Sequence, residues 1–160
     1  MANQINLAPG FGERYPGASA KATEASMNLV LTADMLVKRI GDLVQPFDLT
    51  PSSGLVLGML ADAGTPMPPN QIAERLIISR ASVTSLVDSL ERRRYVRRMP
   101  HSTDRRMILI ELTDAGRQVA HEFRLIVHRH QKDWLAILNP AEQDRLIDAL
   151  HRLQLALTEP

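Results

Sequence analysis

Residues 79–112 combine an amphipathic helix with an arginine-rich hairpin pattern, and this order of elements restricts the fold more than any other feature of the chain. Within 79–93, four apolar residues recur at the spacing of one helical face: Val83, Leu86, Val87 and Leu90. The opposite face carries short polar side chains, which would let the helix backbone approach a DNA major groove closely. The segment is therefore predicted to be a helix with one buried face and one face open to a partner.

Two stretches of strand composition, 95–99 and 107–112, follow this helix and are joined by the turn-rich residues 100–106. This arrangement predicts a β-hairpin with a cationic tip. Segment 79–112 holds eight arginines and four acidic residues, a net charge of +4 against +1 for the whole chain, which leaves −3 for the remainder. Such asymmetry favours a nucleic-acid partner, although a run of charge is also typical of an ordinary solvated surface.

A second, shorter helix is predicted upstream, over 68–76, where proline suits the first helical turn. Ile77 and Ile78 leave only a tight connection, and Ser79 can act as the N-cap of the next helix. Two short helices joined by a tight turn and followed by a basic hairpin describe a winged helix-turn-helix. In that motif the second helix enters the major groove.

The ordered segments of this region resemble the signature of the MarR family, the multiple-antibiotic-resistance regulators, over 72–76, 79–84, 86–93, 96–98, 104–106 and 112–116. The resemblance implies a homodimeric transcription regulator that binds double-stranded DNA, usually a repressor, and often released from its operator by a small-molecule effector. It also implies that 79–93 is the recognition helix and 104–106 the wing tip. There Arg105 or Arg106 would enter the minor groove, oriented by Asp104.

From these considerations nine residues are predicted to contact DNA: Asn70, Gln71, Ser79, Arg80, Ser82, Thr84, Ser85, Arg105 and Arg106. Asn70 and Gln71 are expected near phosphate, and Arg80 and its neighbours in the groove. Many family members carry a basic residue where this chain has Ser85, so the contact made from that position is open. A ligand-independent or architectural DNA-binding protein is the alternative, and it would show little sequence preference.

The resemblance further implies a crevice for small aromatic or phenolic anions between the dimerisation helices and the DNA-binding lobe. By position, six residues are predicted to line it: Met35, Arg39, Phe47, Met59, Phe123 and His128. Arg39 would hold a carboxylate. Methionine and phenylalanine at helical spacing are more often plain core, so the crevice is a hypothesis about the same residues that a packed interior would use.

The expected fold is mainly α with a small β-wing, in which a winged helix-turn-helix lobe at 47–112 is flanked by dimerisation helices at 18–46 and 113–160. Residues 1–17 are predicted to form a flexible N-terminal arm without regular structure. Longer helices are predicted over 19–44, 50–64 and 113–138 and from 141 onward. The last of these helices carries an apolar stripe: Leu146, Ile147, Leu150, Leu153 and Leu157. A second copy of the chain would cover this stripe, which predicts a homodimer and a pseudo-palindromic operator.

Several functional classes are excluded or disfavoured by what the sequence lacks. It contains no cysteine, so disulfides, thiolate metal sites and the cysteine-oxidation switch of one branch of the family are ruled out. Its five histidines do not have metal-ligand spacing, and no phosphate loop or catalytic motif is present, so neither a metal, a cofactor nor an enzyme activity is expected. No signal peptide or membrane span is recognisable, which predicts a cytoplasmic protein without a membrane partner.

Overall fold

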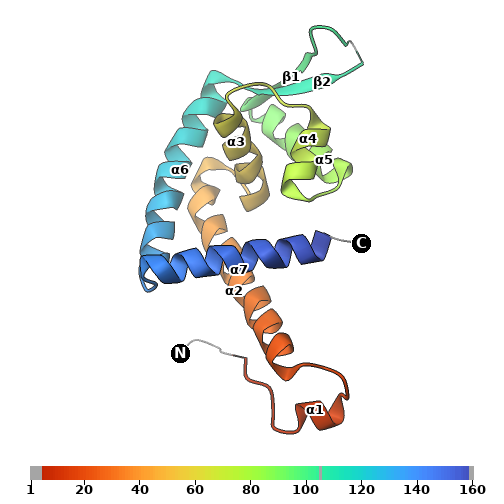
Figure 1. The fold of residues 1–160 in the computed structure, drawn as a ribbon. Coiled ribbons are helices and arrows are strands. Elements are labelled where there is room, and N and C mark those ends of the chain that lie inside the picture. The colour runs from red at the N-terminus through yellow and green to blue at the C-terminus, as the bar shows by residue number, and fades with distance from the viewer. Residues whose placement is uncertain (1–4, 105, 159–160) are drawn as a thin grey trace.

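The computed structural model describes residues 5–104 and 106–158 and is mainly helical with one small antiparallel sheet, which confirms the predicted fold class (Figure 1). The elements, in chain order, are α1 (Phe11–Arg14), α2 (Ala20–Val44), the 3-10 turn η1 (Gln45–Phe47), α3 (Pro51–Ala63), α4 (Pro69–Leu76), α5 (Arg80–Arg92), β1 (Val96–Pro100), β2 (Ile108–Leu112), α6 (Asp114–Leu135) and α7 (Pro140–Thr158).

Side-chain caps define where the main helices begin. The hydroxyl of Thr50 accepts a hydrogen bond from the backbone N–H of Ser53 at 3.2 Å. The hydroxyl of Ser53 in turn accepts from the backbone N–H of Thr50, which completes a capping box. The other capped helices follow the same three-residue spacing, with Ser19, Ser79 and Thr113 as N-caps. The cap predicted at Ser79 is therefore confirmed.

One hydrophobic core joins α3, α4, α5, the sheet and the first half of α6. The predicted stripe of α5 supplies three buried residues to this core: Val83, Val87 and Leu90. Leu86, the fourth residue of the stripe, is half-buried at the edge of the core. Because the apolar face of α5 is fixed against this core, its opposite face points away from the protein.

The wing is anchored to the rest of the lobe by backbone pairing. β1 and β2 are antiparallel, with Val96 opposite Leu112 and Pro100 opposite Ile108. Met67, in the connection between α3 and α4, adds a bridge to Ile110 through two backbone hydrogen bonds of 2.9 and 2.8 Å. The base of the hairpin is thus tied to the helix-turn-helix on one side and to α6 on the other.

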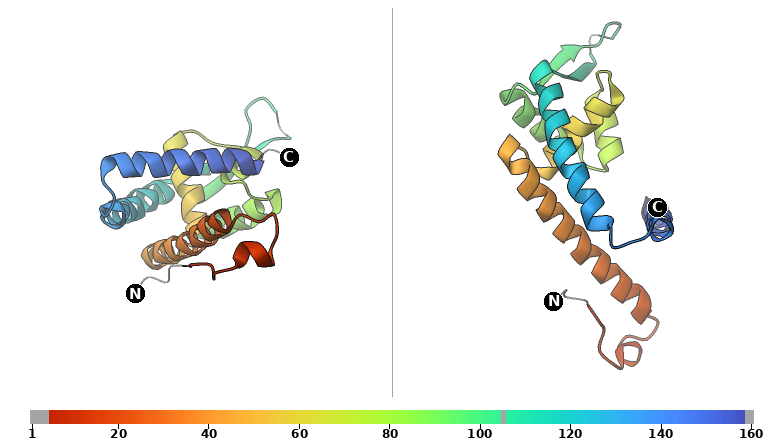
Figure 2. Two further views of the ribbon diagram at one scale, coloured as in Figure 1. Left: turned by 60° about the horizontal axis from the view of Figure 1, so that its bottom comes forward. Right: turned by 90° about the vertical axis from the view of Figure 1, so that its left-hand side faces the viewer.

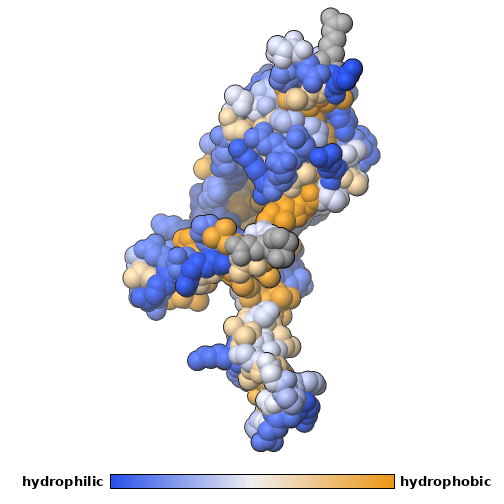
Figure 3. Space-filling model, turned by 45° about the vertical axis from the view of Figure 1, so that its right-hand side comes forward, coloured by the Kyte–Doolittle hydropathy of each residue, from blue (hydrophilic) through white to orange (hydrophobic). Residues whose placement is uncertain are grey.

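The long helices α2 and α7 leave the lobe and remain mostly uncovered (Figures 1 and 2). α2 buries only Val44, and α7 buries none of its described residues. The predicted apolar stripe of α7 is exposed except for the half-buried Leu150, with Ile147 at 65% and Leu153 at 41%. Hydrophobic side chains are visible on this lower part of the surface in Figure 3. None of the helices in residues 5–104 and 106–158 is long and apolar enough to cross a membrane.

The N-terminal segment is more ordered than predicted, so the expectation of no regular structure is wrong for Phe11–Arg14, which forms α1. Its single turn is supported by the rings of Phe11 and Tyr15, whose centroids lie 5.0 Å apart at i,i+4 spacing. Before it, the side-chain amide of Asn28 binds both backbone groups of Ile5, at 3.0 and 2.8 Å, and holds this irregular segment against α2. Residues 1–4 lie outside the described part.

The boundary between the last two helices also differs slightly from the prediction. α6 ends at Leu135 rather than Leu138, since the side-chain amide of Gln143 donates to the carbonyls of Leu135 and Leu138. Asn139 then caps the next helix by accepting from the N–H of Glu142 at 3.0 Å, so α7 begins at Pro140 rather than residue 141.

Candidate nucleic-acid interface

An open groove of about 570 Å³ lies between the start of α4, the first half of α5 and the wing, at the end of the molecule shown uppermost in Figure 1. Four of the predicted DNA contacts line it: Asn70, Arg80, Thr84 and Arg106. The remaining lining residues are Pro68, Pro69, Asp104, Met107 and Ile108. Side chains that are 36 residues apart in sequence, Asn70 and Arg106, therefore share one concave surface.

The other predicted contacts on the helix-turn-helix lie outside the groove lining. Ser82 and Ser85 are exposed on α5, whereas Gln71 is half-buried in the first turn of α4. Ser79 is the N-cap of α5, and its hydroxyl accepts from the N–H of Ser82 at 3.1 Å. Thr84 donates its hydroxyl to the carbonyl of Arg80 at 3.1 Å. A hydroxyl that makes one local hydrogen bond keeps a lone pair that can accept from an outside donor. These contacts therefore orient the side chains and leave them able to bind a partner.

The wing tip is shaped by short-range hydrogen bonds. Asp104 accepts from the backbone N–H of Arg106 at 2.9 Å, and its carbonyl accepts from the N–H of Met107 at 3.0 Å. The ring nitrogen Nδ1 of His101 accepts from the N–H of Asp104 at 3.3 Å. Asp104, predicted to orient the wing arginine, thus binds the backbone of the tip itself. Arg105, one of the two predicted minor-groove residues, lies outside the described residues.

Ion pairs brace the wing against the recognition helix. Arg98 on β1 binds Asp88 at 2.5 Å and also Glu91, both on α5, and the hydrogen bond that Arg98 donates to Asp88 raises the pKa of the Arg98 guanidinium. Arg97 pairs with Glu111 across the sheet at 2.6 Å. Three of the four acidic side chains of segment 79–112 therefore form ion pairs that hold β1, β2 and α5 together.

These pairs decide which positive charges stay available. Arg93 is also paired, with Asp48 of the turn after η1, at 2.6 Å. In the described part of segment 79–112, the arginines outside ion pairs are Arg80, Arg92, Arg94 and Arg106. All four are exposed. The net charge of the region is thus carried by surface side chains that a phosphate backbone could approach.

The pair between Asp48 and Arg93 gives stability a defined pH dependence. The Arg93 guanidinium lowers the pKa of the Asp48 carboxyl, chiefly through the hydrogen bond. Because the folded-state pKa lies below the unfolded one, the contribution of the pair is complete above the ordinary aspartate pKa and is lost as pH falls through the lowered value.

We therefore expect Asp48→Asn to reduce the free energy of unfolding at pH 7 by a small amount, because the pair is largely exposed. The difference from the unchanged chain should shrink at an acidic pH below the lowered pKa of Asp48, where the carboxyl is neutral in both states. Urea unfolding at the two pH values measures it. A difference that is equal at both would mean that Asp48 acts through packing rather than charge.

A second concavity, of about 470 Å³ and mostly apolar, is lined by α2, α3, α6 and the end of α4. Three of the six predicted ligand residues line it: Met59, Phe123 and His128. Phe47 does not; its ring packs on the ring of Phe123 with centroids 6.3 Å apart. The structure does not bring Met35 or Arg39 to this pocket.

The helical register explains the absence of Met35 and Arg39. α2 turns Val37, Ile40 and Val44 toward the pocket, and this one-sided spacing leaves Arg39 and Met35 on an exposed side of the helix. The cationic residues that do line the pocket are Arg75 and Arg124, which sequence reasoning missed. Arg124 could have been predicted from the sequence, because it lies four residues before the predicted ligand residue His128, on the same face of α6. No sequence feature pointed to Arg75.

Arg124 is not a free charge, because it binds Asp62 of α3 at 2.6 Å. Arg75, by contrast, has no ion pair among residues 5–104 and 106–158. Within the same part of the chain, no group of histidine and acidic side chains is arranged to hold a metal ion. The pocket therefore combines apolar walls with guanidinium and imidazole groups, the composition that suits a small amphipathic anion.

Comparisons with known proteins agree on one group. The sequence profile of the MarR family matches residues 47–107. The HTH-type transcriptional regulator PecS of Dickeya dadantii is 34% identical over 91 residues, which cover 56% of this chain and 53% of PecS, so the match spans about half the length of that relative. An uncharacterized HTH-type transcriptional regulator of Mycobacterium bovis is 32% identical over 118 residues, covering 71% of this chain and 77% of that protein.

Among solved structures, the S. aureus MepR–DNA complex has a similar fold, with a TM-score of 0.76 over 83% of this chain and 97% of the MepR chain. Its sequence identity is 23%, so the likeness concerns the fold. The order of elements predicted from the sequence, a helix-turn-helix followed by a wing and flanked by long helices, is thus one that solved proteins adopt.

Proposed function

This chain belongs to the MarR family of DNA-binding transcription regulators, which are not enzymes, and on that premise we propose that it is a homodimeric repressor released from its operator by a small anion. One observation carries the proposal for DNA: the groove that unites the start of α4, the exposed face of α5 and the wing holds the cations Arg80 and Arg106, which form no ion pair within the described part of the chain. A groove of this kind fits the negative backbone of a duplex.

The roles of individual residues follow from their places on this surface. Arg80 and Thr84 line the groove at the start of α5 and read bases in the major groove, with Ser82 and Ser85 beside them. Asn70 and Gln71, at the start of α4, contact phosphate. Arg106 or Arg105 enters the minor groove from the wing. Ser79 acts through capping and orients the first turn of α5.

The proposed homodimer uses the surfaces that the single chain leaves uncovered. α2 and α7 expose apolar side chains over much of their length: Met27, Val30, Met35, Val37, Leu146, Ile147, Leu153, Leu155 and Leu157. Burying them between two copies removes an apolar surface that an isolated chain would expose to water. A two-fold dimer would set two recognition helices about 34–36 Å apart, so the operator is pseudo-palindromic and the protein acts on it in the cytoplasm.

The effector is proposed to bind in the pocket between α2, α3 and α6. Its walls are Phe123, Met59 and neighbouring aliphatic residues, and Arg75 or His128 would hold the anionic group. Such a ligand releases DNA only if it binds the DNA-competent dimer less tightly than the other conformation.

The test is to select duplexes from a random pool with the purified protein, and then to titrate the selected duplex and a scrambled one by fluorescence anisotropy. At physiological salt we expect a preference of about a thousandfold or more for the selected duplex. Light scattering should give twice the 17.9 kDa mass of one chain. Weak and equal binding to both duplexes would contradict a repressor and favour an architectural DNA-binding protein.

A further inference from the structure

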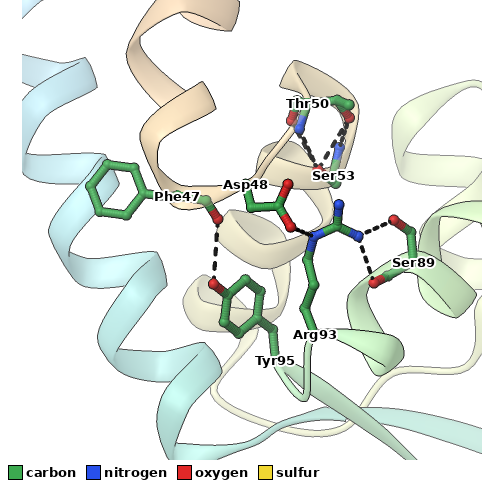
Figure 4. A network of polar contacts seen from close by, with 7 residues as sticks. All are labelled: Phe47, Asp48, Thr50, Ser53, Ser89, Arg93 and Tyr95. Carbon is green, nitrogen blue, oxygen red and sulfur yellow. Dashed lines mark hydrogen bonds and ion pairs between the residues drawn. The ribbon is translucent and has the colours of Figure 1, made fainter.

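The pocket and the recognition helix are connected by a continuous set of contacts, which include the polar contacts shown in Figure 4. We propose that the contacts of Asp48 and Phe47 with Arg93 and Tyr95, called here the η1 clamp, position the end of α5 and transmit the state of the pocket wall to it. The inference rests on the proposed function, because it assigns regulation to the same two sites. Neither Asp48 nor any of its three companions lines the groove or the pocket itself.

The polar half of the clamp holds the C-terminal end of α5. Arg93, the residue after the last turn, donates from Nε to Asp48 Oδ2 at 2.6 Å, and from Nη1 to the carbonyl and hydroxyl of Ser89 at 2.9 and 2.5 Å. Asp48 is fixed in turn by its left-handed backbone, with φ of 57°, directly after η1. One guanidinium thus joins the last turn of the recognition helix to the turn that follows α2.

The second half of the clamp starts from the same turn. The hydroxyl of Tyr95 donates to the carbonyl of Phe47 at 3.3 Å, and Tyr95 begins the path into the wing. The ring of Phe47 lies edge-on to Phe123, with an interplanar angle of 63°. Phe123 is 5% exposed and forms part of the pocket wall. Contacts therefore run without a break from the pocket through two rings to the end of α5.

The pocket side of this path is closely packed. A Cβ atom built on Gly54 would lie 3.8 Å from two atoms of the Phe123 ring and 3.9 Å from Val44, which is already ordinary contact. A leucine at this position is expected to displace the ring, because a close-packed interior passes a displacement on rather than compressing. The Phe123 ring packs on Phe47, whose carbonyl and following residue are the two anchors of the clamp.

Gly58, one turn further along α3, offers a matched control. It also lines the pocket, but a Cβ atom built on it would meet only the side chain of Arg124, at 4.0 Å. Gly54→Leu and Gly58→Leu therefore fill the same pocket with the same side chain, and only the first presses on Phe123. No effector is needed for the comparison.

The experiment is a double-mutant cycle read out as affinity for the selected duplex. Each filling variant is made in the unchanged chain and in a clamp-free chain, Asp48→Ala/Tyr95→Phe, which keeps every arginine. In the unchanged chain we expect Gly54→Leu to weaken binding by about 5-fold or more, and Gly58→Leu to have little effect. In the clamp-free chain the two should be alike, because the path from Phe123 to α5 is cut.

An equal loss from Gly54→Leu in both chains, or no loss in either, would overturn the proposal. Thermal unfolding followed by circular dichroism checks that each variant is folded. If Gly54→Leu does not fold, Phe123→Trp enlarges the same wall from the other side and must show the same dependence on the clamp. If the unchanged chain shows no preference for the selected duplex, the proposed function fails and this inference fails with it. If it does prefer that duplex but the effects of Gly54→Leu and of the clamp substitutions simply add, only this inference fails.

Discussion

Replacement of Arg80 by alanine is expected to weaken binding to the selected duplex by about 1–3 kcal/mol, the usual range for a side chain that contacts a base edge. Arg80 is the first residue of α5, is exposed, and lines the groove together with Asn70 and Thr84. Loss of such a contact should also relax the sequence preference at one operator position. Anisotropy titrations against a set of single-base variants of the duplex measure both effects.

Arg92 supplies the control for loss of charge alone. It is exposed in the last turn of the same helix, does not line the groove, and has no ion pair in the described part of the chain. Arg92→Ala should lower affinity less, and equally for all duplexes, with a shallower salt dependence. If Arg80→Ala behaves in the same uniform way, Arg80 contacts phosphate and the assignment to a base is wrong.

Replacement of Gly116 by alanine is expected to destabilise the fold by about 3 kcal/mol or more, at the upper end for an overpacked site. A Cβ atom on Gly116 would lie 1.9 Å from the backbone carbonyl oxygen of Tyr95. No side-chain rotation relieves this contact, because the backbone fixes the positions of both the Cβ atom and the carbonyl oxygen. The N–H of Gly116 is also bound to the Thr113 cap at 3.0 Å, which holds the start of α6 in place.

The comparison for Gly116→Ala is Gly58→Ala, a change of the same size inside α3. There the new methyl group meets only a flexible side chain at 4.0 Å, so the gain in helix propensity should dominate and raise stability by up to about 1 kcal/mol. Urea unfolding of the two variants should therefore shift in opposite directions. A neutral Gly116→Ala would mean that α6 can move away from Tyr95 without cost.

Local patterns in the sequence predicted most of the DNA-binding lobe. The spacing of Val83, Val87 and Leu90 marked the buried face of α5, and Ser79 marked where this helix begins. These features depend on neighbours within four residues, so they can be read without knowledge of the fold. The resemblance of the same segments to one family then added the wing and the direction in which the helix would meet DNA.

The wing tip illustrates a partial prediction. Asp104 was expected to orient an arginine side chain, and its carboxylate accepts a hydrogen bond from the backbone N–H of Arg106, whereas Arg105 lies outside the described residues. The hairpin itself was predicted from composition, yet its position against α5 depends on Arg98 and its two carboxylate partners. Which arginines remain available to DNA follows from these pairs, and the count of charges in the sequence does not contain that information.

The sequence by itself determined the family, the order of the elements and the face that α5 presents, because periodicity and capping act over a single helical turn. Only the tertiary structure decided which side chains line the pocket, where Arg75 and Arg124 take the place expected for Arg39. It alone also paired Arg93 with Asp48, 45 residues away, and Arg124 with Asp62, 62 residues away. Such contacts depend on how whole helices pack, and packing directions are set by the complete core rather than by any local pattern.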